Sequence, residues 1–158
     1  MTVSIAEAKT SGAADETRVA DLYATLIAGW NDRDAASFAS VFADDGGVIG
    51  FDGIDPQGRM TIEREQQAIF DNHIPAQYVA KVRTIELLAP GVALLRAVAG
   101  MIPPGASDLK PDRNAHQTLL ARKDGDEWHV VLFQNTPAAY DGRPELVDAL
   151  TDELRALI

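Results

Sequence analysis

Two β-rich segments near the end of the chain, residues 115–122 and 128–136, flank the dipeptide Asp124-Gly125. An Asp-Gly pair between two such segments is the strongest local indication of a β-hairpin. The second segment contains Val130-Val131-Leu132-Phe133 without a polar break, which predicts a strand that is covered on both faces. It then continues into Gln134-Asn135, carboxamides that need hydrogen-bond partners where they are buried. A covered strand with a polar end predicts a sheet that lines a pocket.

The length of 158 residues is typical of a single domain with one hydrophobic core. The chain has no cysteine, which excludes disulfides, thiolate metal ligands and a cysteine nucleophile. Its net charge of −10 argues against a nucleic-acid partner, because such binding depends on clustered Lys and Arg. No apolar run approaches the ~20 residues of a membrane span, and the N-terminus lacks the pattern of a signal peptide. We expect a cytoplasmic protein with a mobile arm at residues 1–14.

Four segments have the pattern of helices. Apolar residues recur at three- and four-residue steps from Val19 to Trp30, which predicts an amphipathic first helix. A short second helix follows Asp34, a favourable N-cap. The third covers residues 61–72, and the last begins at Pro144, since proline is favoured at the first helical position.

The remaining segments have the pattern of strands. A short strand is expected at residues 48–53, and longer ones at 78–89 and 92–102 flank Pro90-Gly91, a pair typical of a type II turn. With the hairpin at the end of the chain, these strands predict a four-strand meander. The order of elements indicates an α+β fold, in which helices pack on one face of a curved antiparallel sheet.

Three residues are candidates for the wall and chemistry of the pocket. Trp30 ends the first helix and is either a core residue or a pocket wall, the core role being the commoner one. Asp52 is the acid best placed to be partly enclosed, where a raised pKa would suit a general base, but capping the turn at 53–56 is the more frequent role. His116 is expected beside Phe133 or Gln134, depending on the length of the turn.

Other sequence patterns give little support for a metal, anion or cofactor site. His73, His116 and His129 form no helical pair and have no acid close enough in sequence to complete a metal site, so no metal is expected. Arg83 and Arg96 either clamp an anionic ligand or are surface residues of a strand. The glycines of residues 46–53 lack the dinucleotide-binding spacing, and no flavin, nicotinamide or serine-elbow motif is present, so no cofactor is expected.

The ordered series of short motifs resembles the nuclear transport factor 2-like superfamily. It resembles more narrowly the small proteins of that fold from enediyne polyketide biosynthesis clusters. The matching residues span about 17–136 and are Ala28-Gly29-Trp30-Asn31-Asp32-Arg33-Asp34-Ala35, Phe38, Val41-Phe42-Ala43-Asp44-Asp45, Phe51-Asp52-Gly53, Gly58-Arg59, Ile62, Phe70, Val82-Arg83, Val92-Ala93, Asp124-Gly125, Trp128 and Phe133-Gln134-Asn135-Thr136. Members often carry a histidine four residues before the phenylalanine of the third helix, where this chain has Gln66.

The resemblance implies a cone-shaped cystatin-like roll over residues 15–140, with an extra amphipathic helix at 141–158 packed on it. Relatives are homodimers with an apolar cavity, and they act as polyketide cyclases, ketosteroid-type isomerases or dehydratases, or only bind a ligand. The residues expected at the ligand pocket on this basis are Trp30, Phe51, Arg59, Phe70, His73, Arg96, Gln134 and Asn135.

Three functions are therefore open. The first is an accessory protein that holds a hydrophobic polyketide or polyene intermediate, with a second copy of the chain and a polyketide synthase as further partners and with neither nucleic acid nor membrane. The second is a cofactor-independent cyclase, isomerase or dehydratase, with Asp52 or His116 as acid/base and the two carboxamides orienting a carbonyl. The third is an interaction protein whose cone is filled by side chains.

Overall fold

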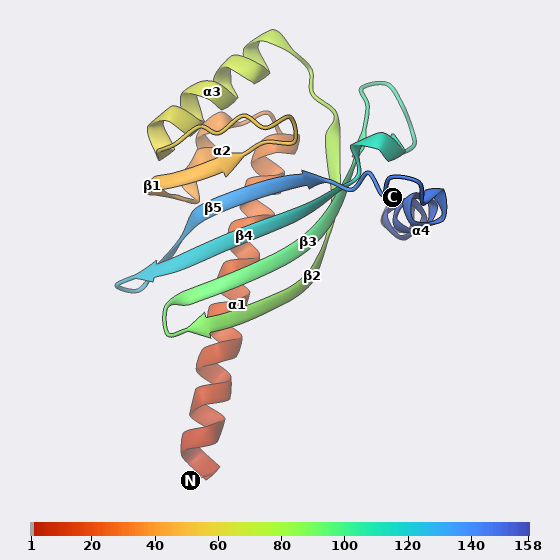
Figure 1. Ribbon diagram of the computed structural model, residues 1–158. Coiled ribbons are helices and arrows are strands. Elements are labelled where there is room, and N and C mark those ends of the chain that lie inside the picture. Colours follow the sequence, from red (N-terminus) through yellow and green to blue (C-terminus); the bar gives the residue numbers. More distant parts are fainter. Residues whose placement is uncertain (1) are drawn as a thin grey trace.

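The computed structural model describes the backbone of residues 2–158 and the side chains of residues 12–158. Within these residues, a five-stranded sheet in the order β1-β5-β4-β3-β2 is combined with four α-helices and one 3₁₀ turn (Figure 1). The helices are α1 (Thr2–Asn31), α2 (Ala35–Ser40), α3 (Arg59–Asn72) and α4 (Pro144–Arg155), and the 3₁₀ turn is η1 (Pro111–Arg113). The strands are β1 (Phe42–Ile49), β2 (Gln77–Ala89), β3 (Val92–Ile102), β4 (Ala115–Asp124) and β5 (Glu127–Pro137).

The predicted α+β fold and the four-strand meander are confirmed. Strands β2 to β5 pair antiparallel in chain order, whereas β1 joins the edge of β5 in the parallel direction. Both predicted turns are present, because Ala89 pairs with Val92 and Asp124 pairs with Glu127. The glycine of each turn adopts a left-handed φ, +76° at Gly91 and +64° at Gly125, which an L side chain rarely tolerates.

A β-bulge decides which side chains of β5 face the core. The register changes between Leu120 and Ala121, so that Val131 has no partner on β4. His116 consequently pairs with Thr136, and neither of the two registers considered for it, beside Phe133 or Gln134, is formed. Alternation from this register turns Gln117 toward the helices and His116 away from them.

The main core lies between α1 and one face of the sheet. Val19, Tyr23 and Leu26 of α1 are almost fully buried, as the helical period predicts. They pack in one cluster with inward side chains of the sheet, namely Ala93, Leu95, Ala97, Leu119, Ala121, Val130 and Phe133. Several of the sheet residues are alanines, whose small side chains let the helix approach closely.

Helix α4 covers only one end of the opposite sheet face. Leu150 and Leu154 pack with Val98 of β3 and Leu109 of the preceding loop in a second, smaller core. The Glu153 carboxylate also pairs with Lys81 (3.2 Å) and Arg83 (2.8 Å) of β2. Figure 1 shows α4 at the end where the strands of the meander converge.

Three boundaries and one burial pattern differ from the sequence-based expectation. Helix α1 begins at Thr2 and includes the expected arm, in agreement with the alanine-rich, proline-free composition of residues 3–14. Strand β1 begins at Phe42 rather than residue 48, while residues 51–53 form a turn. The early start of β1 requires glycine at position 46, because a Cβ there would lie 2.6 Å from the Val130 carbonyl oxygen and clash with it. In β5, Val130 and Phe133 are buried, but Val131 and Leu132 are only half-buried on the outer side.

None of the described helices combines the length and apolar character needed to cross a membrane.

Candidate functional site

A cavity of about 420 Å³ lies between the sheet and the ends of the first three helices. Its walls come from α1, α2, α3, β1, β2, β3 and β5, together with the segments that follow β1, α3 and β3. The lining residues are Trp30, Phe38, Val48, Gly50, Phe51, Asp52, Ile54, Gln66, Ile69, Pro75, Ala76, Tyr78, Met101, Pro103, Lys110, Arg113, Phe133 and Asn135. Its volume and largely apolar, aromatic lining are those of a site for a small organic molecule.

Trp30 is held in place as a rigid part of the cavity wall. Its indole N–H donates to the Ala76 carbonyl oxygen at 2.8 Å. Its ring lies 5.2 Å from the Tyr78 ring and 6.4 Å from the Phe38 ring, measured between centroids. The next residue, Asn31, accepts from the Tyr78 backbone N–H (2.8 Å) and donates to its carbonyl oxygen (3.1 Å). The end of α1 is therefore fixed to β2, and the aromatic wall exists before any ligand binds.

A buried chain of polar side chains leads from the core to the cavity. The Tyr23 hydroxyl donates to Gln117 Oε1, and Gln117 Nε2 donates to Asn135 Oδ1 at 2.7 Å. Gln117 is 1% exposed and Asn135 is 7% exposed, so these hydrogen bonds replace those that water would make. They also orient the Asn135 amide, whose side chain lines the cavity.

Tyr78 lines the cavity together with Asn135. Burial raises the pKa of its phenol to about 12, and a hydrogen bond with the Asn135 side chain offsets part of that rise. Burial likewise raises the pKa of Tyr23 above its ordinary value. Both phenols are therefore protonated near neutral pH, and each carries an O–H that can donate a hydrogen bond.

The mouth of the cavity carries the charged groups. Lys110 and Arg113 reach it from the loop after β3, and Asp52 reaches it from the turn after β1. The Arg113 guanidinium lies 5.4 Å from the centre of the Phe51 ring, a cation–π contact. The exposed Asp52 carboxylate accepts from the Ile54 N–H at 3.3 Å. Asp52 therefore has the turn-capping role, which was the alternative to general-base catalysis in the sequence-based interpretation.

Four predicted site residues line the cavity together, namely Trp30, Phe51, Asp52 and Asn135. Phe70 is buried directly behind the wall, 5.8 Å from Trp30 between ring centroids. The two carboxamides at the predicted polar end of β5 lie on opposite faces of the sheet. Alternation places Asn135 inside and Gln134 on the other face.

The other predicted residues lie outside the cavity. Arg59 forms an ion pair with Asp44 on the surface. His73 ends α3 and is exposed. Arg96 is exposed on the outer face of β3, opposite the buried Leu95 and Ala97. His116 is exposed on the same face of the sheet, on β4, and its Nε2 lies 3.1 Å from the Tyr140 hydroxyl oxygen.

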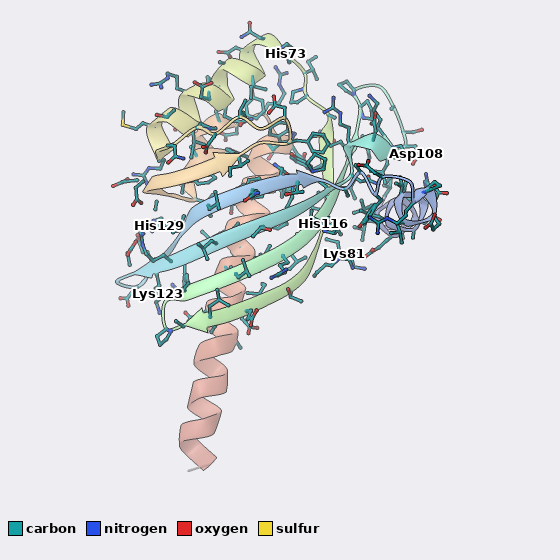
Figure 2. The ribbon with its side chains drawn as sticks, in the orientation of Figure 1. His73, Lys81, Asp108, His116, Lys123 and His129 are labelled. Atoms are coloured by element: carbon teal, nitrogen blue, oxygen red, sulfur yellow. The ribbon has the colours of Figure 1, made fainter. Side chains whose placement is uncertain are left out.

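The three histidines are widely separated. Figure 2 shows His73 beyond the end of α3, His116 on the side of the sheet toward α4, and His129 toward the β4–β5 turn. Across the described residues, no three His, Asp or Glu side chains gather as a potential metal site. His116 and Arg96, assigned to the pocket or its chemistry from the sequence, face away from it.

Sequence reasoning did not assign five polar residues to the site, namely Gln66, Tyr78, Gln117, Lys110 and Arg113. Gln66 lies on the buried stripe of α3, four residues after Ile62 and four residues before Phe70. A polar residue at this period on a buried stripe was the available indication. Gln117 lies beside His116 and faces inward because it alternates with the buried Leu119 and Ala121 of the same strand.

A second, larger hollow of about 670 Å³ lies over α2 and α3. It is open to solvent and is lined by charged side chains such as Arg59, Glu63 and Arg64. It encloses none of the buried polar groups described above, so we take the aromatic cavity as the candidate site.

Comparison with known proteins places the fold. No family model matches the chain, and no curated protein matches it. Among solved structures, the chain is similar to a domain of unknown function with a cystatin-like fold from Nostoc punctiforme, with a TM-score of 0.77 and 23% identity over 86% of this chain and 85% of that one.

Two further solved structures have the same architecture. A ketosteroid isomerase-like protein from Erwinia carotovora has a TM-score of 0.63 and 11% identity, over 78% of this chain and 96% of that one. An NTF2-like protein of unknown function from Pseudomonas putida has a TM-score of 0.62 and 16% identity, over 78% of this chain and 87% of that one. The chain therefore has the NTF2-like, or cystatin-like, fold.

Proposed function

We propose that this protein binds a small hydrophobic molecule of the polyketide or polyene type and serves as an accessory protein in natural-product biosynthesis of the enediyne kind. The observation that supports binding is the aromatic cavity of about 420 Å³, which side chains leave open. An interaction protein with a filled cone would have no such space. The support for a polyketide ligand is the sequence resemblance to small proteins of enediyne clusters. On this proposal the protein works in the cytoplasm beside a polyketide synthase.

Binding can be measured with diphenylhexatriene, a rigid polyene whose fluorescence rises in apolar surroundings. We expect a saturable rise with the wild-type protein. Ile69→Trp should weaken binding at least tenfold, because the larger ring would occupy the cavity that Ile69 lines. Ala68→Trp is the matched control, since Ala68 is exposed on the same helix and does not line this cavity. Absence of any fluorescence change with the wild-type protein would contradict the proposal.

A cofactor-independent isomerase or cyclase is the alternative. It is favoured by the position of Asp52 at the cavity mouth and by the donors of Tyr78 and Asn135 in its wall, which can polarise a carbonyl. A β,γ-unsaturated ketone is a suitable probe, because its isomerisation creates a conjugated chromophore. Turnover that is lost in Asp52→Asn and retained in His116→Ala would support this alternative. Turnover that survives in both variants would remove the proposed acid/base residues.

We also propose that two copies associate through the outer face of the sheet. Leu94, Leu120 and Leu132 form a row of paired residues on that face and are half-buried. Helix α4 packs near Val98 and Val79, further along the face, and does not account for this row. We expect a dimer at micromolar concentration in sedimentation, and a monomer for Leu120→Glu. A monomeric wild-type protein at that concentration would refute dimerisation.

A further inference from the structure

Gln66 lines the cavity, and its side chain carries a buried hydrogen-bond donor without a partner. The residue is 7% exposed, and its Nε2 is enclosed with no acceptor within hydrogen-bond distance. It belongs to the inner stripe of α3 and lines the cavity with Ile69 of the same helix. A buried donor without a partner destabilises a folded protein, and such groups are rare outside functional sites.

Two acceptors of the cavity wall are already engaged with other donors. Asn135 Oδ1 accepts from Gln117 Nε2, and the Ala76 carbonyl oxygen accepts from the Trp30 indole. Most of the remaining lining is apolar or aromatic, and the Asp52 carboxylate is at the exposed mouth. No acceptor of the described residues, the Tyr78 hydroxyl included, bonds to Gln66 Nε2, so a molecule that enters the cavity can supply one.

We propose that Gln66 anchors the ligand by donating a hydrogen bond from Nε2 to a carbonyl oxygen, so that the site selects conjugated or aromatic ketones over hydrocarbons of the same shape. This inference rests on the proposed binding function and names the class of ligand. The acceptor is a neutral carbonyl, because the Gln66 amide supplies no charge to offset the desolvation of a carboxylate, and the cationic Lys110 and Arg113 are exposed at the mouth. The ring or polyene of the ketone would lie against Trp30 and Phe133.

Fluorene and 9-fluorenone form a matched pair of probes, since they differ only in a CH₂ group and a C=O group at the same position. Equilibrium dialysis of each probe against wild-type protein and Gln66→Met measures the preference directly. Methionine keeps the length of the side chain and removes the donor. We expect the wild-type protein to bind fluorenone about tenfold more tightly than fluorene, and the variant to bind the two equally.

The third probe, 9-fluorenol, distinguishes a ligand that accepts from one that donates. Tightest binding of fluorenol by the wild-type protein, lost in Gln66→Met, would mean that the amide presents its oxygen, and would overturn the carbonyl assignment. An unchanged ratio of fluorenone to fluorene affinity in Gln66→Met would also overturn it. Failure of the wild-type protein to bind any of the three probes, or diphenylhexatriene, would instead refute the binding function itself.

Discussion

Gln117→Met is expected to lower the free energy of unfolding by about 4 kcal/mol, because it leaves two buried groups without partners at a cost of roughly 1–3 kcal/mol each. The Tyr23 hydroxyl would lose its acceptor, and Asn135 Oδ1 would lose its donor. Methionine has nearly the same length as glutamine, so the loss reflects hydrogen bonding rather than a cavity. Urea denaturation followed by circular dichroism measures the change.

Two comparisons test the cause of this loss. Thr118→Val changes the next residue of β4, which is half-buried on the opposite face, and should change stability by no more than about 0.5 kcal/mol. Tyr23→Phe removes one end of the chain, so Tyr23→Phe with Gln117→Met should cost less than the sum of the two single changes. Strict additivity, or a Gln117→Met effect as small as that of Thr118→Val, would show that the buried chain contributes little.

The parts of the fold that local sequence determines were predictable. The hairpins at Pro90-Gly91 and Asp124-Gly125 depend on turn residues that favour left-handed φ, and both are present. The helical stripe ending at Trp30 depends on a period that is visible in the sequence, and Trp30 does lie in the last turn of α1 against the core. Such features need no knowledge of distant residues.

The composition of the site was only partly predictable, because it depends on contacts between distant strands. Which face of β4 turns inward depends on its pairing with β3, where Gln117 lies opposite the buried Ala97, while the bulge at Val131 sets only the residues of β5 that pair with it. Alternation along β5 then separates Asn135 from Gln134. Arg59 was expected at the pocket from a motif match, but its partner Asp44 comes from β1, whose path depends on the close approach of Gly46 to β5.

Gly29→Ala is the second change for which we expect a large effect, because it acts where α1 and α2 meet behind the cavity. A Cβ at Gly29 would lie 2.6 Å from the Phe38 backbone nitrogen and 2.9 Å from its Cα. Backbone atoms of a short helix cannot give way without moving the helix, so overpacking outweighs the gain of about 1 kcal/mol that alanine brings to a helix interior. We expect a net loss of about 2 kcal/mol in the free energy of unfolding.

Gly12→Ala is the matched control, because it makes the same substitution in the same helix where space is available. The nearest atom to a Cβ at Gly12 is Leu87 Cδ1 at 3.8 Å, an ordinary contact, so this variant should be as stable as the wild type or more stable by up to about 1 kcal/mol. The two variants should also differ in diphenylhexatriene binding. Phe38 lines the cavity and Trp30 follows Gly29 directly, so a displaced α2 would disturb the aromatic wall only in Gly29→Ala. Equal stability and equal binding of the two variants would show that the close contact between α1 and α2 does not shape the site.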